Sequence, residues 1–426
     1  MRGRIKIHGL IGIILLPLAT VLMRQGQEPF ATYFYCFAWW SYILIADALV
    51  YYIQGESLIL NRTRTFFIMI PWSIFVWCIF EAFNVRLANW HYINVPKGIW
   101  YRWIGYAVAY GTVLPGLCET AHLLKVMGPF RDVSWEGMNK ASLLLKTLIF
   151  LGVICLLAAL LFPYFCFPLI WIGFAFLLDP LNYRYGGGSI LRQIENGDLN
   201  GFLILLAAGL VCGVLWELWN FWAQTKWIYT VPFFEEVKLF EMPLLGFLGF
   251  PPFTVSAFVI YHFLLLLRRK GGICIRVTLW SLLPLFCLLT FVGIDRFSVV
   301  SYIPLIRDMP GVQEEVKGRL QVAGMEKVQD LIYKGEKGLL TIGISPREID
   351  ELLRKSRFIT SKGIGMENYL LLQKVGVDSL SELAQQNPLT LYLTLAEIGR
   401  RQNKSRQTIT LALVKLWVHE AKRRTK

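Results

Sequence analysis

Two stretches of the sequence, FEAFNVRLANWHYINVP (Phe80–Pro96) and WELWNFWAQTKWIYTVP (Trp216–Pro232), carry Glu, Asn, Trp, Tyr and Pro in the same order. The segments before them also match, because WWSYILIADALVYYIQGESLI (Trp39–Ile59) aligns without a gap with WIGFAFLLDPLNYRYGGGSIL (Trp171–Leu191). An ordered match of so many different residue types predicts an internal duplication. We place the two copies at about residues 31–125 and 166–268.

The composition predicts an all-α, multi-pass membrane protein. The 426 residues are 55% hydrophobic and 15% aromatic, and the mean hydropathy is positive, which is more apolar surface than a soluble domain can bury. A helix needs roughly 20 mainly apolar residues to cross a bilayer. About nine segments meet this requirement, at residues 7–23, 31–53, 66–85, 103–124, 144–163, 166–181, 201–222, 244–267 and 277–294. We therefore predict a membrane domain at 1–295 and a soluble α-helical domain at 296–426.

The positive charges predict how the chain crosses the cell membrane. With a cytoplasmic N-terminus, the cytoplasmic segments carry fifteen Lys and Arg against six on the opposite side, and such an excess is typical of cytoplasmic loops. Nine crossings would then place the C-terminal domain outside the cytoplasm. The two copies lie four crossings apart, so they share one orientation and should be related by an axis along the membrane normal.

The sequence contains no motif for a metal, a nucleotide or an activated nucleophile. All eight Cys lie within or beside apolar segments, without a CxxC pair, so we interpret them as buried thiols and predict no metal site. P-loop, dinucleotide, HExxH and GxSxG patterns are also absent from the sequence. The sequence therefore indicates no particular cofactor.

The candidate catalytic residues are the polar pairs of the duplicated motif. Glu81 with Asn84, and Glu217 with Asn220, are three residues apart and share one helical face. A carboxylate facing lipid is costly, so this face should look into the bundle, where Glu could donate or accept a proton and Asn could orient it. The alternative is that these residues are hydrogen-bonding contacts between helices.

Further candidates recur in both copies or adjoin them. The proposed ligand contacts are loop aromatics, a pair of His and one carboxylate: Trp90, Tyr92, Trp227, Tyr229, His122, His262 and Glu241. The aromatic residues could instead be anchors at the membrane interface. We expect a structural role for Asp47 and Asp179, because each precedes a Gly-x-Ser turn, at Ser57 and Ser189, that it could cap.

The order of an acidic residue in a helix, a Trp-x-aromatic loop, a Pro and a broken aromatic helix is similar to the repeats of membrane-type lycopene cyclases and related carotenoid enzymes. That resemblance implies an enzyme acting on long polyenes within the bilayer, with the acid supplied by a Pro-x-Glu-Glu motif. At the corresponding place, MPLLGF (Met242–Phe247), this chain has Leu244 and Leu245 instead of the acid pair.

The soluble tail contains a second repeat. LQVAGMEKVQDL (Leu320–Leu331) matches LQKVGVDSLSEL (Leu372–Leu383), and Gly363 with Gly365 should form a tight turn whose backbone N–H groups could hold a phosphate. Together with the closing VKLWVHEAKRR, these motifs closely resemble a tandem helix-hairpin-helix domain family of unknown function. Such motifs bind DNA backbone or act as protein-interaction modules, and the predicted topology argues against DNA.

Three functions remain open at this point. The first is an intramembrane enzyme that binds or transforms an isoprenoid, carotenoid-like or other membrane lipid by acid–base chemistry. The second is a non-catalytic membrane anchor that presents the C-terminal domain to a protein partner, and the third is a transporter. The duplicated polar face favours the first, and the specific tail motifs favour the second.

Overall fold

The computed structural model describes every residue except 1–4, 134, 139, 233–236, 402–408 and 426, and it confirms a mainly helical fold with a membrane-type helix bundle. The first half of the bundle comprises α1 (Ile7–Arg24), α2 (Phe30–Gln54), α3 (Leu58–Asn61), α4 (Thr63–Leu87), β1 (Trp90–Ile93), α5 (Ile99–Tyr110) and α6 (Val113–Met127). The second comprises η1 (Ala141–Leu144), α7 (Leu145–Leu161), α8 (Pro163–Cys166), η2 (Phe167–Leu169), α9 (Ile170–Tyr185), α10 (Ile190–Glu195), α11 (Leu199–Trp222), β2 (Lys226–Tyr229), β3 (Lys238–Leu239), β4 (Met242–Pro243), η3 (Leu244–Gly249) and α12 (Phe250–Lys270). Helix α13 (Ile273–Phe297) leads to the C-terminal domain.

Eight helical segments within the described residues are long and apolar enough to cross a membrane. The prediction of one continuous spanning helix at segment 103–124 is corrected, because this segment folds as the two shorter helices α5 and α6. Pro115 explains the break, because it has no N–H to bond with the carbonyl of Gly111. Gly111 and Thr112 both keep right-handed helical dihedrals, so the chain direction continues through the junction.

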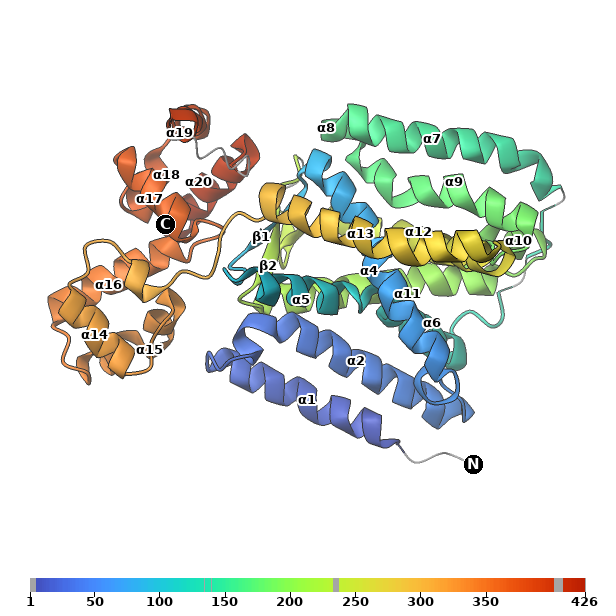
Figure 1. Cartoon of the computed structure of the whole chain (residues 1–426), viewed down its shortest axis with the longest axis horizontal. Coiled ribbons are helices and arrows are strands. Elements are labelled where there is room, and N and C mark those ends of the chain that lie inside the picture. The colour runs from blue at the N-terminus through green and yellow to red at the C-terminus, as the bar shows by residue number, and fades with distance from the viewer. Residues whose placement is uncertain (1–4, 134, 139, 233–236, 402–408, 426) are drawn as a thin grey trace.

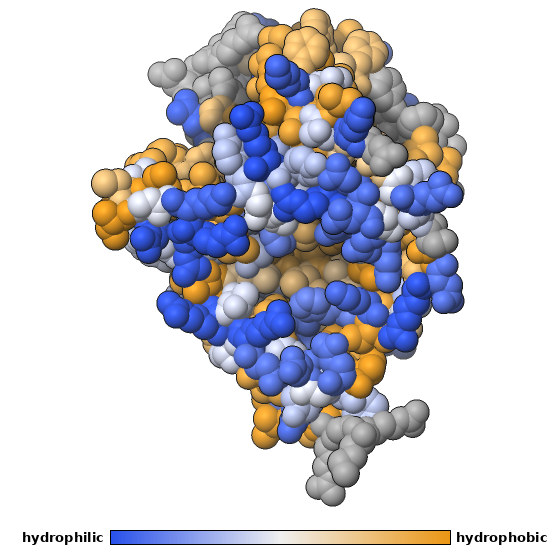
Figure 2. Space-filling view, turned by 90° about the vertical axis from the view of Figure 1, so that its right-hand side faces the viewer, coloured by the Kyte–Doolittle hydropathy of each residue, from blue (hydrophilic) through white to orange (hydrophobic). Residues whose placement is uncertain are grey.

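The N-terminus and the C-terminal domain lie at opposite ends of the bundle (Figure 1). Figure 2 looks onto the end that bears the N-terminus, where hydrophilic side chains surround a hollow with an apolar floor. Apolar flanks with polar ends are the pattern expected of a protein that spans a bilayer. Which end faces the cytoplasm stays a prediction.

The two halves pack in corresponding ways. Helix α2 contacts α1 and α6, and α9 contacts α7 and α12 in the same arrangement. Between the halves the aromatic contacts are reciprocal, since Phe80 stacks on Trp171 with ring centroids 5.5 Å apart, and Trp216 packs on Trp39 at 5.3 Å. The duplication itself stays a prediction, with which this reciprocal packing is consistent.

The loops that follow the two Glu-Asn motifs form a ribbon, which the sequence did not predict. Strands β1 and β2 pair antiparallel in the register Trp90 with Tyr229 and Tyr92 with Trp227. Antiparallel pairing of this kind is what a two-fold axis between like-oriented copies produces. Residues 298–303, after α13, add backbone hydrogen bonds on the other side of β1, such as Tyr92 N–H to the Ser298 carbonyl at 2.8 Å.

The C-terminal domain is helical and has a core of its own. Its elements are η4 (Ile306–Asp308), α14 (Glu314–Val322), α15 (Val328–Leu340), α16 (Pro346–Ile359), α17 (Gly365–Lys374), α18 (Leu380–Gln385), α19 (Pro388–Arg401) and α20 (Leu411–Thr425). Gly324 and Gly376, in register in the predicted repeat, end α14 and α17 with φ of +77° and +75°, a conformation that favours glycine.

The predicted turn at Gly363 and Gly365 joins α16 to α17, and its phosphate site stays a prediction. Both glycines are buried, and a Cβ on Gly363 would lie 3.2 Å from the side chains of Ile93 and Ile228. The turn therefore packs closely against the ribbon.

A buried ion pair fixes α5 to α13. Arg102 Nε and Nη2 donate to the two Asp295 oxygens at 2.7 and 2.6 Å, and the N–H of Trp103 and O–H of Tyr106 donate to the same carboxylate. The paired geometry matches the guanidinium fork to the carboxylate and makes the contact strong. Arg102 Nη1 also donates to the Pro96 and Lys97 carbonyls, which connects this pair to the end of the ribbon.

We expect Asp295→Asn to lower the free energy of unfolding in detergent by about 3 kcal/mol, because it leaves the Arg102 charge buried without its counterion. The measurement is a denaturant titration followed by circular dichroism. Asp308→Asn, at a carboxylate whose side chain is 44% exposed, is the matched control and should change stability little. Equal stability of the two variants would contradict a structural role for the pair.

Candidate functional site

Asn84 and Asn220 fasten the start of each ribbon strand. Asn84 Nδ2 donates to the Trp90 carbonyl at 2.8 Å, and its Oδ1 accepts from the N–H groups of Asn89 and Trp90. Asn220 makes the same contacts with Trp227, donating at 2.9 Å and accepting at 3.0 Å. The predicted role of orienting the Glu carboxyls is therefore corrected, because both amides are occupied by strand backbone.

Glu81 lies behind an aromatic wall. Its Oε1 accepts hydrogen bonds from Trp77 Nε1 at 2.8 Å, Trp90 Nε1 at 3.0 Å and Tyr92 O–H at 2.5 Å. The side chain is completely buried, and Tyr110 O–H in turn donates to Tyr92 Oη at 3.0 Å. Trp90 and Tyr92 thus connect β1 to the carboxyl on α4, while Trp77 belongs to α4 itself. All three donors reach Oε1, and the buried Oε2 makes no hydrogen bond to a described residue.

Glu217 has the corresponding position in the second half. It is also completely buried and accepts from Tyr229 O–H at 2.7 Å, while Trp227 Nε1 donates to Tyr229 Oη at 2.8 Å. Burial, and then the neighbouring carboxyl, raise the pKa of Tyr92 and of Tyr229 well above the ordinary value. Both phenols therefore stay protonated near neutral pH and act as hydrogen-bond donors.

A cavity of about 470 Å³ lies beneath the ribbon, and its walls are mainly aromatic and aliphatic. Tyr92 and Tyr229 line it, whereas Glu81 and Glu217 stand one residue further back. Aromatic rings from both halves meet along this wall, including Trp90 and Trp171, which stack with centroids 6.1 Å apart. The cavity size falls within the range of small-molecule sites in proteins.

Matching positions of the two halves line the cavity. The alignment that pairs Trp39 with Trp171 also pairs Tyr33, Tyr35 and Cys36 with Phe165, Phe167 and Pro168, and all six residues border the cavity. A second set, Gly105, Tyr106, Ala109 and Tyr110, corresponds to Leu245, Gly246, Gly249 and Phe250 in the alignment that pairs His122 with His262. The cavity therefore lies between the halves and is lined by segments that the predicted duplication pairs.

Apolar side chains at the rim indicate where the cavity opens. Phe165, Leu245 and Leu248 border it, yet they are 70%, 50% and 69% exposed. They lie on α8 and η3, next to other exposed apolar residues such as Phe162 and Leu244. An apolar rim that continues into an exposed apolar surface would face hydrocarbon in a bilayer, so the opening is suited to a ligand that arrives through the membrane.

His122, His262 and Glu241 do not border this cavity, so their predicted ligand contact is not seen. His122 lies on α6 with its ring 4.0 Å from the Cys118 sulfur, and His262 on α12 packs against Phe258 at 4.2 Å. His262 instead borders a separate pocket formed by Gly186–Gly188 and the end of α12.

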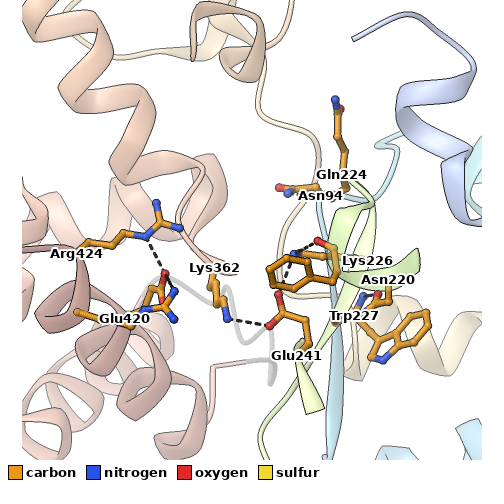
Figure 3. A network of polar contacts seen from close by, with 11 residues as sticks. Asn94, Asn220, Gln224, Lys226, Trp227, Glu241, Lys362, Glu420 and Arg424 are labelled. Atoms are coloured by element: carbon orange, nitrogen blue, oxygen red, sulfur yellow. Dashed lines mark hydrogen bonds and ion pairs between the residues drawn. The ribbon is translucent and has the colours of Figure 1, made fainter. Parts of the chain in front are cut away.

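Glu241 connects the membrane bundle to the C-terminal domain (Figure 3). Its two oxygens accept from Lys226 Nζ at 2.9 Å and Lys362 Nζ at 2.8 Å, and its side chain is 2% exposed. Burial alone would raise the pKa of this carboxyl, but the two ammonium groups hold it below its ordinary value. Glu241 therefore connects the bundle to the C-terminal domain through two ion pairs.

Asp47 and Asp179 hold the N-terminal ends of short helices. Asp47 Oδ1 accepts from Ile59 N–H at 2.8 Å, and Asp179 accepts from the N–H groups of Ile190 and Leu191 at 2.9 and 2.8 Å. Ser57 and Ser189 are the N-caps of α3 and α10 and accept from Leu60 N–H and Arg192 N–H, each at 3.3 Å. These contacts are the ones that the expected capping role requires.

Several residues of the site were missed from the sequence. Trp77 precedes Glu81 by four residues, a helical spacing that could have identified it as a partner. Tyr110 and Arg102 come from α5, and no sequence spacing connects them to Glu81 or Asp295. His8 Nε2 lies 2.9 Å from Asp47 Oδ2, and Glu119 is fully buried on α6; neither follows the duplicated pattern.

The comparisons identify a family only for the C-terminal domain. Residues 310–424 match the family described as "Domain of unknown function (DUF4332)". No curated protein and no solved structure matches the chain. Among the described residues, no group of three or more His, Cys, Asp or Glu is arranged to hold a metal ion.

We expect Asn84→Ala to destabilise the ribbon by roughly 3 kcal/mol, because three hydrogen bonds are lost and buried backbone groups remain without partners. Hydrogen exchange of the amides in residues 89–93 should accelerate. Asn94→Ala is the control, since the Asn94 side chain makes a single hydrogen bond, to the Gln224 carbonyl, and should have a smaller effect. Unchanged exchange in Asn84→Ala would contradict the anchoring role.

His91 provides a prediction about pH. It lies on β1, is 1% exposed, and burial lowers its pKa from 6.5 to about 4. The unfolded chain therefore binds more protons between these values, so stability should be complete above pH 6.5 and decline as pH falls towards 4, by about 3 kcal/mol. His91→Leu should flatten this slope in denaturant titrations at pH 7, 5.5 and 4. An identical slope in both proteins would disprove this assignment.

Proposed function

We propose that this protein binds a long apolar membrane ligand, of isoprenoid or carotenoid-like chemistry, in the cavity beneath the ribbon. The observation that carries the proposal is the cavity itself: segments that the predicted duplication pairs line it from both halves, and the apolar residues at its rim are exposed. Its lining includes two Tyr O–H groups, each backed by a buried Glu, together with polar residues such as Arg102 and Lys226. Such a site would take a ligand from the bilayer, and its Tyr O–H groups would bind a polar or polyene segment at one end of that ligand.

The same geometry supports acid–base chemistry as part of the proposal. Tyr92 and Tyr229, which reach the cavity, would give a proton to a ligand atom, and the phenolate left behind would be stabilised by its remaining donor. That donor is Tyr110 O–H for Tyr92 and Trp227 N–H for Tyr229. Glu81 and Glu217, in their acid forms, would each pass a proton to the phenolate and become carboxylates, and each would regain a proton through Tyr when the ligand later loses one; they act through Tyr as positioning residues.

A second candidate function is a non-catalytic anchor for the C-terminal domain. The extensive contacts of this domain with the ribbon favour it, including Ile93 and Ile228, which belong to the domain's own hydrophobic core. In this case the cavity would remain empty of specific lipid, and substitutions in its wall would not change any ligand. The two candidates therefore differ in what copurifies with the protein.

The position of the C-terminal domain is also a proposal. It lies at the end of the bundle opposite the N-terminus, so a cytoplasmic N-terminus places it outside the cytoplasm. Its partner would then be a protein of that compartment, and chromosomal DNA would be out of reach.

We expect Ala109→Trp to abolish ligand retention, because the added indole would fill the cavity that Ala109 borders. Val108→Trp is the matched control: it lies on the same helix, is 38% exposed and does not border the cavity. Native mass spectrometry of the purified proteins, with extraction of bound lipid, measures which ligand each protein retains.

A defined apolar molecule that is present in the wild type and in Val108→Trp, but absent from Ala109→Trp, supports the cavity as a binding site. The same lipid profile in all three proteins would contradict the proposal and leave the anchor function.

A further inference from the structure

The ribbon has two faces that belong to different parts of the protein. Alternate residues of a strand point to opposite sides, so Trp90, Tyr92, Trp227 and Tyr229 border the cavity. Ile93 follows Tyr92, and Ile228 lies between Trp227 and Tyr229, so both point to the opposite side. Ile93 and Ile228 are 2% and 1% exposed and pack in the hydrophobic core of the C-terminal domain.

The ribbon depends on this second face for its stability. Each strand has four residues, and an isolated two-stranded ribbon is at best marginally stable in water. Here the linker to the C-terminal domain supplies further backbone bonds, with Val300 N–H donating to the Tyr92 carbonyl at 2.9 Å and Ile303 N–H to that of Val95 at 3.0 Å. Removal of the domain would expose Ile93 and Ile228 to water and leave that face of the ribbon without its packing.

Glu241 holds the domain at the same place (Figure 3). Its partner Lys226 belongs to β2, and its partner Lys362 immediately precedes the Gly363 turn of the domain. The next residue in the chain, Met242, borders the cavity. This single buried carboxylate therefore connects one cavity wall, the ribbon and the C-terminal domain.

Two more polar contacts complete the docked surface. Tyr333 of α15 accepts a hydrogen bond from Gln224 at 2.9 Å, just before β2. Lys327 forms an ion pair with Glu28, in the loop between α1 and α2. The domain thus contacts both halves of the bundle on either side of the ribbon.

We infer that the C-terminal domain is the lid of the cavity, and that its docking sets the position of the Tyr–Glu pairs. This inference rests on the proposed function, because the cavity that the lid covers is the proposed ligand site. When the domain is docked, the ribbon is rigid and the cavity is closed to water at that end. When a partner draws the domain away, the ribbon loses its outer packing and water reaches Tyr92 and Tyr229. Binding at the C-terminal domain would in this way regulate the ligand site.

The test uses a native thiol, and it needs no ligand. Cys36 borders the cavity, whereas Cys274 is exposed at the start of α13. Purified full-length protein is treated with a water-soluble thiol reagent that bears a sulfonate, and the labelling rate at each cysteine is read by peptide mass spectrometry. Cys274 serves as the internal standard.

We expect Lys362→Glu to accelerate labelling of Cys36 by at least about tenfold, because a second carboxylate beside buried Glu241 favours the undocked state. Lys374→Glu, at an exposed lysine of the same domain, is the matched control and should label as the wild type does. In a Glu241→Gln background the effect of Lys362→Glu should shrink, since the two residues act as a pair.

Hydrogen exchange of residues 226–229 shows whether the domain has been released. If the C-terminal domain is released but the labelling rate of Cys36 is unchanged, the inference that this domain is the lid of the cavity is overturned. If Lys362→Glu does not release the domain, a Lys327→Glu, Lys362→Glu double variant removes both ion pairs, and unchanged exchange there would also overturn the inference. Loss of the lid effect leaves lipid retention untouched, so this failure is distinguishable from failure of the proposed function.

Discussion

The antiparallel pairing of β1 with β2 is the constraint on which the other features depend. It joins β1 of the first half of the bundle to β2 of the second. Because side chains alternate along each strand, the aromatic residues face the cavity and Ile93 and Ile228 face the C-terminal domain. Asn84 and Asn220 fix where each strand begins. A shift of one residue in this register would exchange the two faces and bury the wrong side chains on both.

The buried carboxyls follow from the same arrangement. A carboxyl group within a membrane bundle is costly unless donors surround it, and the ribbon brings Tyr92 and Trp90 to Glu81, and Tyr229 to Glu217. The tyrosines then separate the carboxyls from the cavity. This layered order, with phenol in front and carboxyl behind, is why the phenols are the proposed contacts with a ligand and the carboxyls are positioning residues.

Much of the fold could be predicted from the sequence, because helix length, hydropathy and a duplicated motif are local signals. The pairing of Glu81 with Trp77 follows from helical spacing, and the turn glycines of the C-terminal domain follow from their positions in a repeat. The ribbon could not be predicted, since four-residue strands depend on tertiary contacts with residues 298–303. Nor could the roles of Glu241 and Arg102, whose partners Lys362 and Asp295 are distant in sequence. Pro115 indicates the break between α5 and α6 in the sequence. The prediction of one helix at 103–124 missed it because it relied on hydropathy alone.

In each half of the bundle, the Trp and Tyr that follow the Glu-Asn pair build part of the wall of the proposed ligand cavity. The most direct test of this site is native mass spectrometry, with lipid extraction, of the wild type and of a Glu81→Gln, Glu217→Gln double variant, with folding checked by circular dichroism. We expect a specific isoprenoid or other apolar lipid on the wild type, and its loss or a much weaker signal on a folded double variant. The Gln oxygens can still accept from Tyr92 and Tyr229 O–H, but an amide is a weaker acceptor than a carboxylate, so the phenols would be held less firmly. Absence of any specific lipid from the wild type, or equal retention by a folded variant, would contradict it.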